Sequence, residues 1–181
     1  MTFVSILRGI NVGGHRKILM QDLKLLYEDL GFVHVKTFIQ SGNVIFQTQN
    51  SISEDIFSDR IENAIKTSFH FEVPVIIRTA DKLQRILSSN PFLLEENIDT
   101  DKLHLTLLKN IPKPGIPGNT NNSDFLPDRF AINERDIYLY CPGGYGNTRL
   151  SNALFEKMFR SVATTRNWRT IISLSNLVTL E

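Results

Sequence analysis

The sequence is poor in residues on which several common classes of protein depend. It contains one cysteine, Cys141, in 181 residues, so it cannot form an intramolecular disulfide, and a disulfide-stapled secreted domain is excluded. The four histidines show no metal-ligand spacing among themselves or with Cys141. The sequence therefore predicts no metal site and no cofactor, and we expect Cys141 to be an inert, packed thiol.

Long apolar runs and an excess of one charge are also lacking. The apolar start of the chain, residues 1–8, is too short for a signal peptide, and no segment approaches the length of a membrane span. We therefore expect a cytoplasmic protein without a membrane partner. The net charge is +1, so no global field favours nucleic acid or a membrane surface.

The composition that remains is that of an ordinary globular protein. It is 41% hydrophobic and 22% charged, and the chain is long enough to bury a core. Charge is unevenly spread, because residues 8–24 and 149–169 are locally basic and residues 95–101 are acidic. The acidic run has no EF-hand pattern, so we expect a solvated loop there.

The order of periodic segments predicts an α+β fold. Short apolar runs indicate strands, and helical spacing or a capping pattern indicates helices. In the first half, we expect strands at residues 3–8, 35–39, 43–47 and 73–78, and helices at residues 19–30 and after the capping-box pattern 51–54. The resulting order, β-α-β-β-α-β, is that of a ferredoxin-like unit.

The second half is expected to repeat this order and to add a C-terminal helix. Strands are predicted at residues 104–109, 130–133, 137–141 and 161–165, and helices at residues 152–160 and 168–180, with a short helix before Leu126. The predicted fold is thus a duplication of two ferredoxin-like units. Its predicted subdomains are residues 1–79 and 102–181, joined by a helix and acidic linker at residues 80–101, and the two could also pack as one compact domain.

The main candidate for chemistry is the loop from Arg8 to Lys17. Glycines after a strand let backbone N–H groups face an anion, and a following helix start adds positive potential. The loop's charged residues are Arg8, His15, Arg16 and Lys17. The loop has neither the P-loop nor the dinucleotide-binding pattern. The alternative interpretation is a tight solvated connection that needs glycine only for its backbone conformation.

Three further segments carry polar groups of the same kind. The turn 41–43 offers a hydroxyl and an amide, the glycine-rich segment 142–149 ends in Arg149, and the segment 164–169 holds two arginines around Trp168. Guanidinium groups bind phosphate or carboxylate in a bidentate manner. Each segment also has a purely structural interpretation, and for Trp168 we favour a role as a core anchor.

Three separated segments, residues 7–17, 39–46 and 165–170, resemble the DUF1697 family of uncharacterised bacterial proteins, and the resemblance covers essentially the whole chain. It implies a duplication of two ferredoxin-like units, and it implies no established activity. The family pattern has Ser-Lys-Leu where this chain has Thr148-Arg149-Leu150. Because arginine does not replace lysine in proton transfer, this chain would lack any such role that the lysine has in relatives.

The leading hypothesis is the binding of a small anionic ligand, such as a nucleotide or phosphorylated metabolite. The ligand would occupy a cleft formed by the loop 8–17, the turn 41–43 and the segment 165–169. The candidate ligand-binding residues are Arg8, Asn11, Gly13, Gly14, His15, Lys17, Ser41, Gly42, Asn43, Arg149, Arg166 and Asn167.

Two alternatives stay open. The first is a nucleic-acid-binding module in which Phe38 and Phe46 of the central hairpin stack on bases, although the neutral net charge does not favour it. The second is an interaction or scaffold protein without ligand chemistry. No base or nucleophile is assigned, and His15 is the one candidate base, so the sequence leaves open whether the protein is an enzyme.

Overall fold

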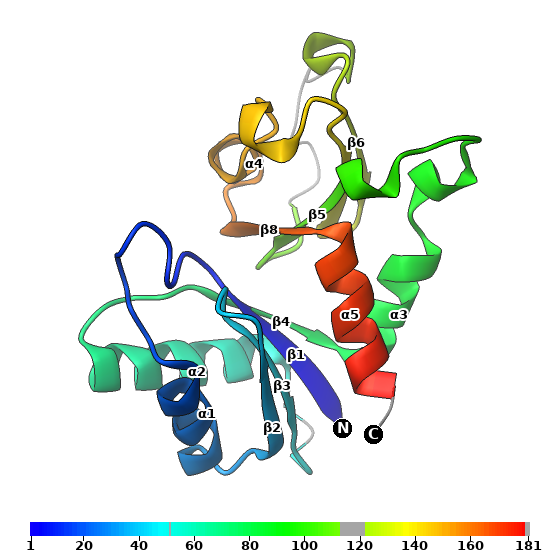
Figure 1. The fold of residues 1–181 in the computed structure, drawn as a ribbon. Coiled ribbons are helices and arrows are strands. Elements are labelled where there is room, and N and C mark those ends of the chain that lie inside the picture. The colour runs from blue at the N-terminus through cyan, green and yellow to red at the C-terminus, as the bar shows by residue number, and fades with distance from the viewer. Residues whose placement is uncertain (51, 113–121, 180–181) are drawn as a thin grey trace. The chain divides into compact units, whose positions relative to one another are not determined.

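The computed structural model describes residues 1–50, 52–112 and 122–179. By the density of internal contacts the chain divides into two compact units, which are described separately. Unit 1 comprises residues 1–84 and 174–181, and unit 2 comprises residues 85–173. The described part contains two four-stranded antiparallel sheets and five α-helices (Figure 1). The predicted α+β class is therefore confirmed.

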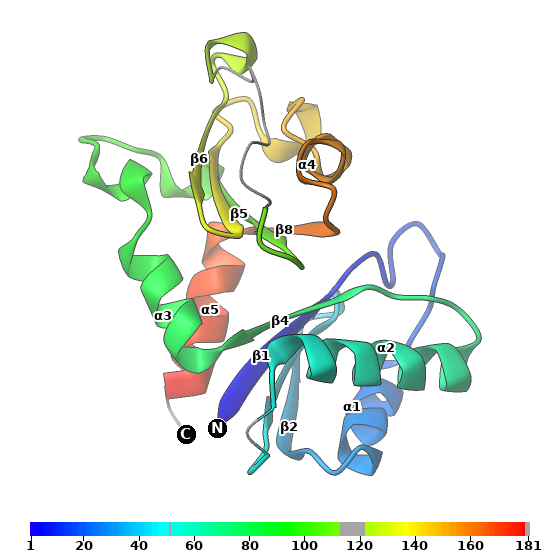
Figure 2. The same ribbon diagram turned by 180° about the vertical axis from the view of Figure 1, so that it is seen from behind.

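The sheet of unit 1 has two helices on one face (Figures 1 and 2). Its strands lie in the order β2-β3-β1-β4, and β1 pairs antiparallel with both β3 and β4. The elements in chain order are β1 (Thr2–Leu7), α1 (Met20–Asp29), β2 (Val33–Phe38), β3 (Asn43–Gln47), α2 (Glu54–Phe69) and β4 (Val75–Thr79). The predicted β-α-β-β-α-β order of this half is confirmed.

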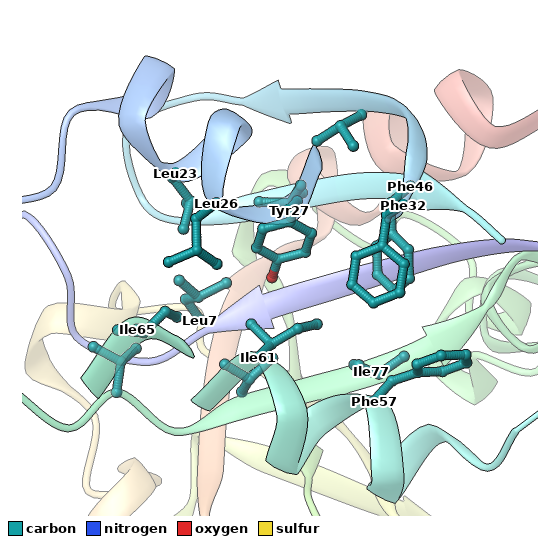
Figure 3. Packing of buried hydrophobic residues seen from close by; sticks show 14 of the residues in the cluster. Leu7, Leu23, Leu26, Tyr27, Phe32, Phe46, Phe57, Ile61, Ile65 and Ile77 are labelled. Carbon is teal, nitrogen blue, oxygen red and sulfur yellow. The ribbon is translucent and has the colours of Figure 1, made fainter. Parts of the chain in front are cut away.

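The core of unit 1 lies between these two helices and the sheet. Apolar residues three or four apart place one face of each helix against the strands, as Figure 3 shows. The labelled contributors are Leu23, Leu26 and Tyr27 from α1, Phe57, Ile61 and Ile65 from α2, and Leu7, Phe32, Phe46 and Ile77 from the sheet and the segment before β2. The ring centroid of Phe46 lies 5.5 Å from that of Phe3 and 4.4 Å from that of Phe32.

The burial of Phe46 corrects one detail of the sequence interpretation. Its side chain is 0% exposed, so it packs in the core and cannot stack on a base. The strand pattern around it is apolar on both faces, with Val44 and Ile45 buried as well. A strand of this kind does not reveal which aromatic ring faces solvent.

Two element boundaries differ from the prediction for identifiable reasons. Strand β4 begins at Val75 rather than at residue 73, because Pro74 has no N–H to donate to the ladder. Helix α2 is capped by Ser53, whose Oγ accepts a hydrogen bond from the Ile56 N–H (3.4 Å), whereas the predicted box began at Ser51, which lies outside the described residues. Thr79 caps helix α3 (Ala80–Ser88), since its Oγ1 accepts a hydrogen bond from the Lys82 N–H (3.2 Å).

Unit 2 contains a sheet of corresponding strand order, β6-β7-β5-β8. Its strands and helices are β5 (Leu103–Leu108), β6 (Arg129–Asn133), β7 (Asp136–Tyr140), α4 (Asn152–Phe159), β8 (Ala163–Asn167) and the first part of α5 (Trp168–Thr179). The described residues of unit 2 also form the 3-10 segments η1 (Pro91–Leu94), η2 (Thr100–Lys102), η3 (Asn122–Phe125) and η4 (Tyr145–Asn147). The short helix expected before Leu126 is thus a 3-10 segment, and residues 113–121 lie outside the described residues.

A buried pair of hydroxyls connects α1 to the sheet of unit 1. The Tyr27 hydroxyl and Ser5 Oγ are 2.6 Å apart, and both residues are 0% exposed. Burial raises the pKa of Tyr27 far above its usual range, since a phenolate would lose its hydration there. The hydroxyl therefore stays protonated, and the pair is a neutral hydrogen bond.

The Tyr27→Phe substitution is expected to lower the free energy of unfolding by about 1–2 kcal/mol, because it leaves Ser5 Oγ with a longer contact (3.4 Å) to the Val44 carbonyl oxygen. The Tyr27→Phe/Ser5→Ala double variant should lose less than the sum of the two single losses, since it removes both partners. Urea denaturation measures the three values. Strict additivity would show that the hydrogen bond is not coupled.

Candidate functional site

The loop between β1 and α1 has an unusual backbone. Its tip is a turn in which the His15 N–H donates to the Val12 carbonyl oxygen (3.1 Å). Gly13 and Gly14 form the centre of this turn with φ of 59° and 80°. Two consecutive positive φ values are those of a type I′ turn, which strongly favours glycine. The two glycines are therefore needed for the shape of the tip.

Asn11 holds the base of this loop. Its Oδ1 accepts from the Ile18 N–H (2.9 Å), and its Nδ2 donates to the carbonyl oxygens of Ile18 and Gln40 (both 3.0 Å). Both amide hydrogens are thus used inside the chain. The structure gives Asn11 the role of closing the loop and tying it to the β2–β3 turn.

A pocket of about 530 Å³ lies beside the loop, within unit 1. We call it the loop pocket, and its lining residues are Asn11, Gly14, Lys17, Ile18, Leu19, Met20, Asp22, Gln40 and Phe69. Asn11, Gly14 and Lys17 are among the predicted site residues. The other six are not among the candidate ligand-binding residues, although Gln40 directly precedes the predicted turn 41–43. Phe69 in particular comes from the far end of α2, so no local pattern could have indicated it.

The loop pocket carries two charged side chains of opposite sign. Neither Lys17 nor Asp22 makes a hydrogen bond or an ion pair with any other residue of the described ranges. Helix α1 also begins at this pocket. Its N-cap residue is Leu19, whose side chain has no atom that can accept a hydrogen bond from the first turn of the helix. The first backbone N–H groups of α1 are therefore left without an intrahelical or capping acceptor.

The turn between β2 and β3 packs closely against the end of β1 and the start of the loop. Gly42 has φ of 77°, and a Cβ there would lie 2.7 Å from Ile10 Cδ1 and 2.8 Å from Leu7 Cβ. Asn43 is 0% exposed, and its Nδ2 donates to Ser41 Oγ (3.0 Å). Gly42 and Asn43 thus have structural roles in building this turn.

The residue that leads into the turn is strained. Ile39 has φ of 50°, a conformation that β-branched residues rarely adopt. Its side chain is 50% exposed, so burial of the side chain does not explain the conformation. Strain of this kind is concentrated at functional sites, and the next residue, Gln40, lines the loop pocket.

The predicted residues of unit 2 also contribute to local structure. The Arg166 guanidinium donates to Thr164 Oγ1 and to the Thr165 carbonyl oxygen (both 3.0 Å), and burial lowers its pKa to about 10. Asn167 Oδ1 accepts from the Thr170 N–H (2.8 Å) at the start of α5. The predicted role of Trp168 as a core anchor is confirmed, since the side chain is buried.

The glycine-rich segment 142–149 is held by its own arginine. The Arg149 guanidinium donates to the Asp124 carbonyl oxygen and lies 5.1 Å above the centre of the Phe125 ring. Cys141, just before this segment, is buried, and burial raises its pKa to about 11. The expectation that Cys141 is a packed thiol is therefore confirmed.

A polar network that the sequence did not indicate lies on the sheet of unit 2. The His104 ring stacks on the Tyr145 ring with centroids 4.9 Å apart, and its Nδ1 is 3.2 Å from the Lys102 carbonyl oxygen. The Tyr145 hydroxyl donates to Thr165 Oγ1 (2.9 Å), which donates to Asn152 Oδ1 (2.7 Å). Each hydroxyl has a partner, so the network fixes the 142–149 segment to the sheet.

Comparisons with known proteins place this α+β chain in a family. A family model described as "Protein of unknown function (DUF1697)" matches residues 1–138, and the chain belongs to this family. The solved structure of the conserved bacterial protein SP0830 from Streptococcus pneumoniae is similar, with 19% identity, a TM-score of 0.69 and coverage of 97% of each chain. That likeness concerns the fold. The comparison with curated proteins gave no match.

The described residues also bear on two other kinds of site. None of the helices in residues 1–50, 52–112 and 122–179 is both long and apolar enough to pass through a membrane. Within the same ranges, no three His, Cys, Asp or Glu side chains are grouped so as to hold a metal ion.

The Gly42→Ala substitution should destabilise the protein strongly, because the added Cβ would overlap Ile10 and Leu7 and the left-handed backbone disfavours alanine. We expect a loss of about 2–4 kcal/mol in the free energy of unfolding. The matched control is Gly31→Ala, which has φ of 80° and no atom within 4 Å of the new Cβ; it should lose only about 1 kcal/mol. Equal losses in urea denaturation would contradict the proposed close contact.

The His104 imidazole should make stability depend on pH. Burial lowers its pKa, so below about pH 6.5 the unfolded chain takes up a proton that the folded chain does not. The contribution of the neutral His104 imidazole to the free energy of unfolding is thus fully present above the pKa that histidine has in the unfolded chain, and it is lost as the pH falls below that value. Between pH 7 and pH 5, His104→Phe should therefore lose less free energy of unfolding than the wild type. Urea denaturation across this range tests the difference.

Proposed function

We propose that unit 1 binds a small anionic ligand in the loop pocket. The observation that carries the proposal is Lys17, a cation that lines this pocket and has no partner among the described residues. The volume of about 530 Å³ lies in the range that small-molecule sites occupy. An unpaired cation in a concave site of this size is available to bind an anionic group.

The start of α1 adds to the same potential. Its free backbone N–H groups carry the positive end of the helix dipole, which favours an anion there by about 0.3–1 kcal/mol. Lys17 lies three residues before Met20, the first residue of the helix. The side-chain charge and the backbone donors are therefore close enough in sequence to act on one anionic group.

The other cations proposed from the sequence contribute differently. Arg8 follows β1 at the root of the loop, and its N–H donates to the Pro74 carbonyl oxygen (2.9 Å). Arg166 belongs to unit 2, where it is bonded to Thr164 and Thr165. We therefore propose that Lys17 neutralises the charge of the ligand. Asn11, Gly13 and Gly14 maintain the conformation of the loop.

We also propose that each unit is ferredoxin-like and that the fold is a duplication. The support is the equivalent antiparallel strand order of the two sheets, β2-β3-β1-β4 and β6-β7-β5-β8. In this proposal, residues 1–79 and 102–181 are the two halves, and residues 80–101 join them. A cytoplasmic location belongs to the same proposal, supported by the single, buried Cys141.

The Lys17→Met variant tests the ligand site. Inorganic phosphate, glucose 6-phosphate, AMP and hexanoate are each titrated in a thermal-shift assay, and we expect saturable stabilisation by at least one of them, worth about 2.7 kcal/mol at a hundred times its Kd. Lys17→Met should weaken that binding at least tenfold, since it removes the unpaired cation. The matched control is Lys157→Met, at an exposed position of α4 in unit 2, which should bind as the wild type does.

Two results would contradict the proposal. One is the absence of saturable stabilisation by any of these anions. The other is an affinity that does not change in Lys17→Met. Salt-sensitive binding of a short oligonucleotide, combined with the first result, would favour the nucleic-acid alternative.

A further inference from the structure

The loop pocket also contains a carboxylate that the binding of a simple anion does not use. Asp22 lines the pocket, is exposed and has no partner among the described residues. It is the third residue of α1, on the same turn as the free backbone N–H groups. Any anion at Lys17 therefore binds in the field of a second, negative side chain.

Lys17 and Asp22 do not neutralise each other. Among the described residues, Lys17 and Asp22 form no ion pair with each other, whereas Lys24 and Glu28 of the same region do (3.7 Å). Both charges are thus available to a third group. Two unlike, unpaired charges in one pocket are most fully satisfied by a ligand that has one charge of each sign.

The remaining lining of the pocket is largely apolar. Ile18, Met20 and Phe69 contribute hydrocarbon or aromatic surface, which gains free energy when an apolar group covers it. Ile18 is itself held by Asn11 through its backbone N–H (2.9 Å). The pocket therefore combines a positive group, a negative group and an apolar surface.

We infer that the ligand of the loop pocket is a small zwitterion with an apolar body. Its carboxylate lies at Lys17 and the first N–H groups of α1, its ammonium lies at Asp22, and its hydrocarbon part covers Met20 and Phe69. The inference rests on the proposed function and names the ligand class. Two classes of amino acid have this chemistry. In α-amino acids the ammonium and carboxylate groups are attached to the same carbon, and in ω-amino acids they lie at opposite ends of the hydrocarbon chain.

Electrostatics argues against a more highly charged ligand at the same place. Two like charges 4 Å apart repel by about 1 kcal/mol even in bulk water, and by more near a protein surface. A phosphate dianion at Lys17 would bring two negative charges into the pocket that Asp22 also lines. The ammonium group of a zwitterion is instead attracted by the Asp22 carboxylate.

The experiment uses four probes of similar size with the full-length protein. Norleucine and 6-aminohexanoate are isomeric zwitterions that differ in the spacing of their charges, hexanoate has only the anionic group, and pentylamine has only the cationic group. Isothermal titration calorimetry should show that one zwitterion binds about tenfold more tightly than either singly charged probe. That ratio corresponds to about 1.4 kcal/mol, and the better isomer shows the charge spacing of the ligand.

The variants separate the two charges. Asp22→Asn should reduce the affinity for that zwitterion to the level of hexanoate, without weakening hexanoate itself. The matched control is Asp29→Asn, the same change on the same helix at an exposed position outside the loop pocket. It should bind the zwitterion as the wild type does. Because Asp22 and Asp29 are both exposed, the two variants should unfold within about 1 kcal/mol of the wild type in urea, and the larger loss is expected for Asp22→Asn, which removes a negative charge from the first turn of α1.

The outcomes distinguish the inference from the function on which it rests. Hexanoate binding as tightly as both zwitterions, with Lys17→Met still weakening it, would overturn the inference and leave the anion site intact. The same applies to zwitterion binding that Asp22→Asn does not change. If neither the zwitterions nor hexanoate nor inorganic phosphate binds, the inference and the proposed function both fail.

Discussion

The Asn11 side chain is the contact on which the loop pocket depends. Three hydrogen bonds join its amide to the backbone of Ile18 and Gln40, so one residue sets where the loop ends and where the β2–β3 turn lies beside it. The turn can approach because Gly42 has no Cβ to collide with Ile10 and Leu7. Lys17 and Asp22 belong to a region whose backbone is held in place by the hydrogen bonds of Asn11. Under the proposed function, the charges of these two side chains are therefore available to a ligand.

Hydrophobic periodicity was sufficient to predict most of the fold. Helices α1 and α2 bury residues spaced three or four apart against an apolar sheet, and this spacing is visible in the sequence. The boundaries of elements depended on single residues. Helix α2 begins after Ser53, because the Ser53 hydroxyl accepts a hydrogen bond from the first turn. Strand β4 begins after Pro74, because proline has no N–H to donate to the neighbouring strand. The side chain of Phe46 could not be assigned to a face, because its strand is buried on both.

The candidate site was less predictable, for a physical reason. Glycine and asparagine in a loop are compatible with ligand binding and with backbone geometry, and their number does not distinguish the two. Asn11 and Asn43 hold the loop and the turn in place through hydrogen bonds, and it is only in the proposed function that Lys17 provides the charge that binds the ligand. Phe69 joins the pocket from α2, and such a long-range contact has no local signal. The His104–Tyr145 stack in unit 2 escaped prediction in the same way.

Under the proposed function, the electrostatic field inside the loop pocket limits which ligands bind there. The free N–H groups of α1 and the Lys17 ammonium are positive, but Asp22 lies within the first turn and offsets part of both. A site for polyphosphate has the opposite arrangement, in which several donors and cations converge without a carboxylate. The loop pocket instead holds balanced charges beside apolar surface. Selectivity in such a site comes from matching the sign and position of each ligand charge, since a group of the wrong sign meets repulsion as well as lost attraction.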